Sequence, residues 1–145
     1  MLFVLSPSIG LFLPESGAPA SAGDSVQTYL DNLEKVRALA PTALFHSHGP
    51  LREDIDERIA WLSEHQRERA ERVLSLVGEH PDATGFEITK LIGFNLPHKT
   101  WEDVSCVQRL TLMEIGAAFL RHLELRGLVE ARTDGNGIRR YRLAD

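Results

Sequence analysis

Apolar and polar positions alternate with a helical period over much of the chain, which predicts a mostly helical protein. The first such pattern begins after Asp24 and ends before Pro41, with apolar residues from Val26 to Leu39 on one face. Asp24 and Gln27 form a capping pair at its start. We therefore predict an amphipathic helix of about sixteen residues in this part of the chain.

The longest helical pattern begins at Asp54 and ends at Gly78 or Pro81. One apolar stripe runs along it, and the opposite face is strongly polar, as expected for a helix surface in contact with water. His65 falls on the polar face. We therefore expect the His65 side chain to be solvated.

Two further helices are predicted over residues 84–93 and 111–127. Each begins with a Thr-x-x-Glu capping box and ends at a glycine. The long connection between them, residues 94–110, contains the lone cysteine of the chain, Cys106, which we expect to be half-buried and without a role. His122 falls among apolar residues of the last helix, so we expect it to pack against the core.

The end of the chain predicts a β-hairpin. Two β-prone runs, LVEAR and IRRYRL, flank the sequence TDGNG, whose residues tolerate positive φ. Because strand residues alternate between two faces, Arg140 and Arg142 share one face while Tyr141 and Leu143 share the other. Three helices followed by a two-stranded ribbon is the order of a winged-helix module. We therefore predict one over residues 52–145, and a separate unit over residues 1–51.

Composition and charge narrow the classes of function. The chain has 145 residues, of which 43% are hydrophobic and 26% charged, which is typical of a soluble globular protein. Its formal net charge is −5, and no part of the chain has the basic excess that binding to nucleic-acid phosphates requires. A single cysteine excludes an internal disulfide and a Cys-based zinc site, which fits a cytoplasmic protein.

The apolar N-terminal run, MLFVLSPSIGLFLP, predicts a buried strand followed by a loop. Pro7 and Pro14 interrupt the run, no basic residues precede it, and it is shorter than the ~20 residues that span a bilayer. We therefore expect neither a signal peptide nor an association with a membrane.

The stretch TALFHSHGPL contains the candidate metal ligands. We expect a short strand, TALFH, and a turn, SHGP, so that His46 and His48 point to the same side. A catalytic zinc needs about three protein ligands and an open position for water. No spacing in the rest of the chain suits a metal, although four more histidines occur: His65, His80, His98 and His122.

Five segments carry a resemblance to a known family. They are SPSIGLFLPESG, GDSVQTYLDNLEKVRAL, LFHSHGPL, RIAWLSEHQRERAERVLSLV and FLRHLELRGLVE. In this order they resemble the C-terminal part of a metallo-β-lactamase-superfamily hydrolase with an appended winged-helix domain. The resemblance implies an α+β, mostly helical chain in which residues 1–51 are a remnant of the metallo-β-lactamase fold (strand, helix, strand and His-Gly turn).

The resemblance also assigns one metal ligand. In the family, the histidine of a Pro-Gly-His-Gly-like turn is the last zinc ligand, and alignment on the following Gly-Pro places it at His48. His46 and Ser47 stand where the family usually has Pro and Gly, so His46 is no ligand by resemblance. The other ligands of the family lie upstream of the segment that matches residue 1. Zinc is thus implied for the complete enzyme, with weak binding or none by this chain alone.

Two functions remain open. By resemblance, the complete enzyme uses a zinc-activated water to hydrolyse an ester, thioester or phosphodiester bond in a small-molecule ester or an RNA. We then expect this chain to be inactive alone. Its partner would be a catalytic domain that is missing or separate, or further copies of the chain in a homo-oligomer. The alternative is a stand-alone winged-helix module that binds a partner or a nucleic acid.

Sequence-specific DNA binding is not expected of the winged helix. The connection over residues 94–110 is longer than the short turn of a helix-turn-helix reader, and the charges of the following helix are balanced. The hairpin carries Arg139, Arg140 and Arg142, which are candidates for contact with RNA or an acidic partner.

Overall fold

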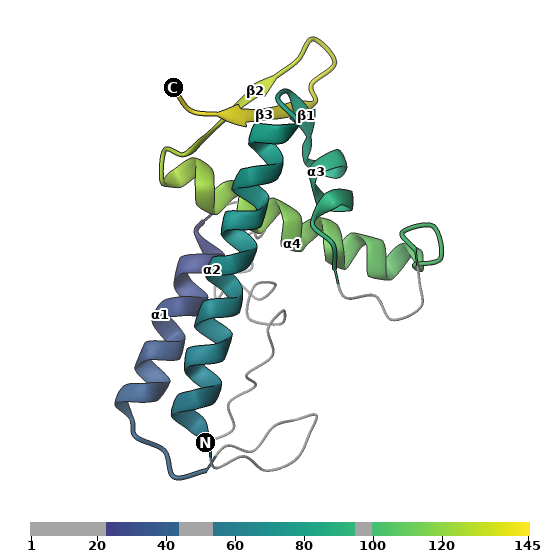
Figure 1. The fold of residues 1–145 in the computed structure, drawn as a ribbon. Coiled ribbons are helices and arrows are strands. Elements are labelled where there is room, and N and C mark those ends of the chain that lie inside the picture. The colour runs from purple at the N-terminus through teal and green to yellow at the C-terminus, as the bar shows by residue number, and fades with distance from the viewer. Residues whose placement is uncertain (1–22, 44–53, 95–99) are drawn as a thin grey trace.

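The computed structural model describes residues 23–43, 54–94 and 100–145. These residues form a mostly helical α+β structure with a small antiparallel sheet (Figure 1). The mostly helical prediction is therefore confirmed for this part of the chain. The elements, in order, are α1 (Ser25–Ala38), α2 (Ile55–Glu79), β1 (Ala83–Thr84), α3 (Gly85–Leu91), α4 (Cys106–Leu125), β2 (Val129–Thr133) and β3 (Arg139–Leu143).

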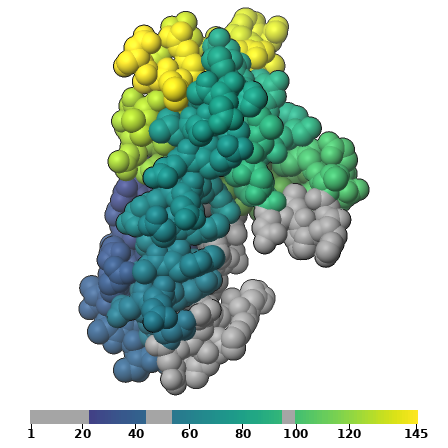
Figure 2. All heavy atoms as spheres, in the orientation of Figure 1, coloured from purple at the N-terminus to yellow at the C-terminus, as the bar shows by residue number. Residues whose placement is uncertain are grey.

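Helix α2 is the long central element, and it contacts α1, α3, α4 and β3. Figure 1 shows α1 beside its N-terminal half and the sheet at its C-terminal end. In the space-filling view, α2 forms much of the visible surface between these two ends (Figure 2). Its buried apolar residues recur at helical spacing toward each end of the element, and the buried residues between them, Ser63 and Gln66, are polar. The apolar ones are Ile55, Ile59, Leu62, Val73, Leu76 and Val77.

The predicted hairpin is confirmed, and the sheet gains a third strand. The strand order is β1-β3-β2, with Tyr141 of β3 opposite both Ala83 of β1 and Ala131 of β2. Asp134 closes the hairpin turn, since its carboxylate accepts hydrogen bonds from the backbone N–H groups of Asn136 and Ile138 at 2.9 and 3.0 Å. Strand β1 was not predicted, because two residues before a helix show no alternation of their own.

Several predicted helix ends are confirmed. The Asp24 carboxylate accepts a hydrogen bond from the backbone N–H of Gln27 at 2.9 Å, which caps α1. The capping box of Thr84 and Glu87 opens α3. Gly93 and Gly127, which follow α3 and α4, have φ of 76° and 70°.

The predicted start of α4 was wrong. The helix begins at Cys106, after a capping box in which Ser105 and Gln108 bond each other's backbone N–H at 3.3 Å. Thr111 lies inside the helix, and its hydroxyl donates to the Val107 carbonyl oxygen at 3.2 Å. Glutamine serves at this position as well as glutamate, and burial of Val104 anchors the earlier start in the core.

The early start of α4 also corrects the prediction for Cys106. The cysteine is exposed rather than half-buried. It is the first residue of the helix, and Val107 and Gln108 beside it are exposed too. Among the described residues, no helix is long and apolar enough to cross a membrane.

Helices α3 and α4 approach each other closely at Gly116. A Cβ atom at Gly116 would overlap the Thr89 hydroxyl oxygen and lie 3.0 Å from the Thr89 Cβ and Cγ2 atoms. Thr89 is fully buried, and its hydroxyl donates to the Gly85 carbonyl oxygen at 2.6 Å. The absence of a side chain at Gly116 therefore sets the distance between the two helices.

Replacement Gly116→Ala should destabilise the protein. Overpacking a core typically costs about 1–3 kcal/mol, and Thr89 can move away only by losing its hydrogen bond, which adds about 1 kcal/mol. Alanine gains only ~1 kcal/mol over glycine within a helix, so we expect a net loss of about 2 kcal/mol in the free energy of unfolding, measured by urea denaturation.

The matched control is Gly135→Ala in the hairpin turn, where nothing lies within 4 Å of the added Cβ. It should change the free energy of unfolding by less than about 0.5 kcal/mol. Equal stabilities of the two variants would contradict the close approach of α3 and α4.

Candidate functional site

The predicted metal ligand His48 lies outside the described residues, as do His46 and His98. Within residues 23–43, 54–94 and 100–145, no group of three or more His, Cys, Asp or Glu side chains is placed to hold a metal ion. The described residues thus do not form a zinc centre by themselves, and we assign no catalytic step to them. His48 as a ligand stays a prediction.

His65 is not the solvated residue that was expected. Its ring is half-buried and stacks on Trp61, with the centroids 5.1 Å apart and the planes at 6°. Its Nε2 atom lies 3.0 Å from Arg69 Nη2. Burial, and then the positive charge of Arg69, lower the pKa of His65. The prediction failed because helical periodicity shows only which face a residue lies on. It does not show that the side chains of Trp61 and Arg69 on the same face partly cover His65.

The three arginines of β3 each have an acidic partner. The guanidinium of Arg139 contacts Glu124 at 2.7 Å, and that of Arg142 contacts Glu130 at 3.0 Å. Arg140 contacts Asp134 at 2.9 Å and also donates to the Asp82 carbonyl oxygen at 3.1 Å.

These pairs reduce the positive charge that the hairpin offers to a partner. The Glu130 carboxylate raises the pKa of Arg142 further above its ordinary range. The pairs themselves are exposed or half-exposed, so each contributes little to stability. Their consequence is electrostatic: a phosphate group would have to displace a carboxylate at each arginine.

The structure joins His122 and Asp24, which are 98 residues apart in the sequence. His122 is buried, as expected for a packing residue, and its Nδ1 atom lies 2.9 and 3.0 Å from the two carboxylate oxygens of Asp24. Asp24 caps α1 at the same time. One carboxylate therefore ties the start of α1 to the last turn of α4. Sequence spacing could not reveal a pair so far apart.

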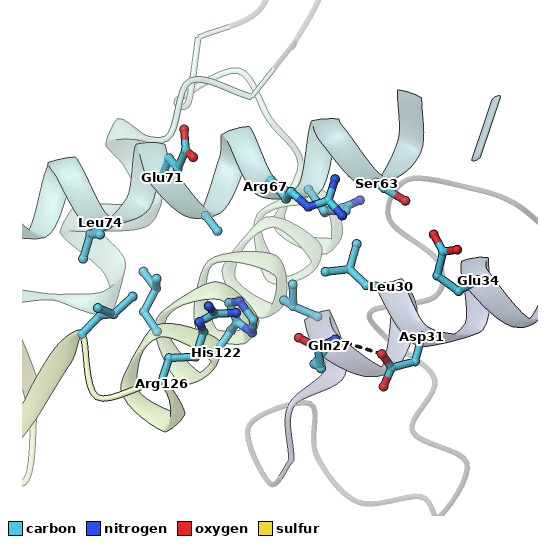
Figure 3. Close-up of a pocket in the computed structure, with 15 residues that line it drawn as sticks. Gln27, Leu30, Asp31, Glu34, Ser63, Arg67, Glu71, Leu74, His122 and Arg126 are labelled. Atoms are coloured by element: carbon cyan, nitrogen blue, oxygen red, sulfur yellow. Dashed lines mark hydrogen bonds between the residues drawn. The ribbon is translucent and has the colours of Figure 1, made fainter. Parts of the chain in front are cut away.

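A cavity of about 540 Å³ lies beside this pair, between α1, α2 and the C-terminal end of α4 (Figure 3). We refer to it as the α1–α2–α4 cavity. Leu30 of α1 and Leu74 of α2 form part of its apolar wall, and Ser63, Arg67 and Arg126 are among its polar lining residues. Polar and charged residues outnumber the apolar ones in its lining, and they include the carboxylates of Asp31, Glu34 and Glu71, so it is more polar than a typical small-molecule site.

Comparison with known proteins finds a similar protein of named family and no matching family model. No protein-family model matches the chain. The chain is 22% identical over 81 residues to a protein named "Beta-lactamase-like protein 2 homolog" from Caenorhabditis elegans, a match that covers 56% of this chain and 28% of that protein.

Two solved structures share the fold. A beta-lactamase domain protein from Burkholderia ambifaria matches with a TM-score of 0.71 and 23% identity over 99% of this chain. A metallo-beta-lactamase family protein from Thermus thermophilus matches with a TM-score of 0.63 and 21% identity over 83% of this chain. The chain is distantly related to metallo-β-lactamase family proteins.

This relation confirms the coarser part of the sequence-based resemblance. The chain spans only part of its metallo-β-lactamase relatives: 36% of the Burkholderia protein and 34% of the Thermus protein. The relation therefore concerns the fold of one portion of those proteins.

The bond between Asp24 and His122 can be tested by two substitutions. Asp24→Ala removes both the cap of α1 and the partner of a buried imidazole, so the free energy of unfolding should fall by about 2–3 kcal/mol. Asp24→Asn keeps a good cap and should lose about half as much.

The control is Asp31→Ala, which removes an exposed bond to Gln27 on the same helix and should cost less than about 0.5 kcal/mol. Chemical denaturation measures all three variants. If Asp24→Ala were no more damaging than Asp31→Ala, the proposed tie between α1 and α4 would be wrong.

Proposed function

We propose that this chain is the C-terminal portion of a metallo-β-lactamase-fold, metal-dependent hydrolase that cleaves an ester, thioester or phosphodiester bond. The observation that carries the proposal is the match to the Burkholderia protein, which extends over 99% of this chain but only 36% of that protein. In this proposal, residues 1–51 complete the catalytic fold and residues 52–145 form a winged helix.

The order of elements supports the winged-helix part of the proposal. Helix α2 is followed by β1, α3, α4 and the β2–β3 hairpin, and the strand order is β1-β3-β2. This is the helix and hairpin order of winged-helix modules. Helix α4 would occupy the place of the reading helix, but its first turns expose Val107 and Leu110, which are 72% and 63% exposed, rather than cations.

His48 is the zinc ligand that this proposal assigns to the chain. A zinc centre needs about three protein ligands, so the others would come from a catalytic domain, either on the same polypeptide or on a separate one, or from a second copy. A bound zinc lowers the pKa of a water so that it attacks the scissile bond. Alone, the chain is expected to bind zinc weakly or not at all.

Replacement of His48 should distinguish this proposal from the alternative that the chain shares the fold but supplies no metal ligand. We would extend the reading frame upstream of Met1, express the resulting protein, and measure its zinc content and its zinc-dependent hydrolysis of ester, thioester and phosphodiester reporters. His48→Ala should lower kcat/KM by about a hundredfold or more and reduce the zinc content.

His46→Ala, two positions away, is the matched control and should stay within a few fold of the unchanged protein. Two results would contradict the proposal: equal activity of the two variants, or zinc-dependent hydrolysis by residues 1–145 alone.

The second candidate function is a stand-alone module that contacts RNA through the hairpin. The placement of Arg139, Arg140 and Arg142 on one strand, β3, favours it, whereas their acidic partners oppose it. The double replacement Arg140→Glu and Arg142→Glu should abolish binding of a single-stranded RNA, measured by fluorescence anisotropy at a stated salt concentration.

A double replacement on α2, Arg67→Glu and Arg72→Glu, makes the same charge change away from the hairpin and serves as the control. Circular dichroism checks that both variants are folded. Unchanged RNA affinity in the hairpin variant would rule out the RNA contact.

A further inference from the structure

Strand β2 forms an open edge of the sheet (Figure 1). The strand order is β1-β3-β2, and within residues 23–43, 54–94 and 100–145 no further strand pairs with the outer side of β2. β2 pairs with β3 without a break from Val129 to Thr133, so no bulge interrupts this edge. An edge strand presents unpaired backbone N–H and C=O groups, which can pair with a strand of another chain.

Three residues of β2 direct their backbone N–H and C=O groups to the open edge: Val129, Ala131 and Thr133. Successive residues of an antiparallel ladder bond alternately to one side and to the other. At the two ends of β2, the Ala144 N–H donates to the Leu128 carbonyl oxygen at 3.0 Å, and the Asp134 N–H donates to the Ile138 carbonyl oxygen at 2.9 Å. The even-numbered positions of β2 therefore bond to β3, and the odd-numbered positions face outward.

The side chains of β2 carry two opposite charges at symmetrical positions. Glu130 and Arg132 stand on either side of Ala131, and both lie on the same face of the sheet. Charged side chains on an edge strand are a common means of preventing association, because charges of one sign repel a second copy of the same strand. This edge has one charge of each sign, so it does not repel its own copy.

Both charges can accept a further partner. Arg132 is exposed, forms no ion pair among the described residues, and stands directly opposite Arg140 of β3, an unfavourable position for two like charges. Glu130 is bonded by Arg142, but both of these hydrogen bonds go to its Oε2 atom. The Oε1 atom of Glu130 is therefore left to meet a cation beyond the edge.

We propose that β2 pairs with β2 of a second copy of this chain, antiparallel and about a two-fold axis at Ala131. The two Ala131 residues then exchange backbone hydrogen bonds, and Val129 of each copy does so with Thr133 of the other. Glu130 of each copy lies opposite Arg132 of the other, at a position without backbone bonds, where paired side chains approach most closely. The two sheets become one continuous sheet.

The charges select this register among those that the backbone allows. The outward groups belong to alternate residues, so the axis can move only to a neighbouring residue of β2 if these groups are still to meet. An axis at Glu130 would place the two Glu130 side chains opposite each other, and an axis at Arg132 would do the same for the arginines. Only the axis at Ala131 pairs opposite charges, which favours a second copy over an unrelated strand.

Sedimentation velocity of the full chain tests the proposal. One short strand from each copy makes a small interface, so we expect a weak dimer that forms as the concentration rises from roughly 10 μM to 1 mM. Glu130→Arg and Arg132→Glu should each weaken the dimer at least about tenfold, because each places like charges opposite each other. An equal mixture of the two variants should dimerise again, because opposite charges then face each other across the strands.

The matched control is Arg67→Glu, which reverses an exposed arginine of α2 and should leave the dimer unchanged. Ala131→Pro removes an outward N–H group and none that bonds to β3, and it should also weaken the dimer at least about tenfold. Hydrogen exchange is a second readout, since the amides of Val129, Ala131 and Thr133 should exchange more slowly as the dimer forms. Thermal unfolding verifies that each variant is folded.

Three results would overturn the proposal. A chain that stays monomeric over this range of concentration would leave the edge of β2 unpaired or available to a strand of another protein. A dimer that the charge reversals on β2 affect no more than Arg67→Glu would form through another surface. Folded variants whose mixture does not dimerise would exclude the register centred on Ala131.

Discussion

The rest of the structure depends on the buried face of α2, which is apolar toward both ends of the helix and polar, at Ser63 and Gln66, between them. This helix has 25 residues and is therefore ~37 Å long. Its N-terminal half packs against α1, and its C-terminal half packs beneath the sheet, with α4 crossing between them (Figure 1). Because a helix shorter than this would lose one of these two sets of neighbours, the length of α2 determines that the described elements share a single hydrophobic core.

Where the three helices α1, α2 and α4 meet, the core is partly polar. Ser63, Gln66 and His122 are all buried there, and Asp24 reaches His122 from the start of α1. Buried polar groups are costly unless they are paired, so they specify how the helices fit together more strictly than apolar contacts do. The α1–α2–α4 cavity lies in the same region. Ser63, Gln66 and His122 line it together with apolar residues such as Leu30 and Leu74.

The hairpin pairs most of its own charges. The three arginines of β3 contact Glu124, Glu130 and Asp134. At the other end of α4, Arg109 donates to the carbonyl oxygens of Val104 and Glu102, and the exposed residues Val107 and Leu110 are apolar. A phosphate backbone attracts unpaired cations, so both surfaces fit a nucleic acid less well than their count of arginines implies.

The sequence by itself determined the features that depend on neighbouring residues: the periodicity of the helices, the caps at Asp24 and Thr84, the glycines that end α3 and α4, and the Asp-Gly turn. It also carried the relation to metallo-β-lactamase proteins. The tertiary structure alone decided which of two capping boxes starts α4, that β1 joins the sheet, and that His122 meets Asp24 from 98 residues away. Each of these depends on packing between segments that are distant in sequence. A local sequence pattern does not show which distant residue will be in contact.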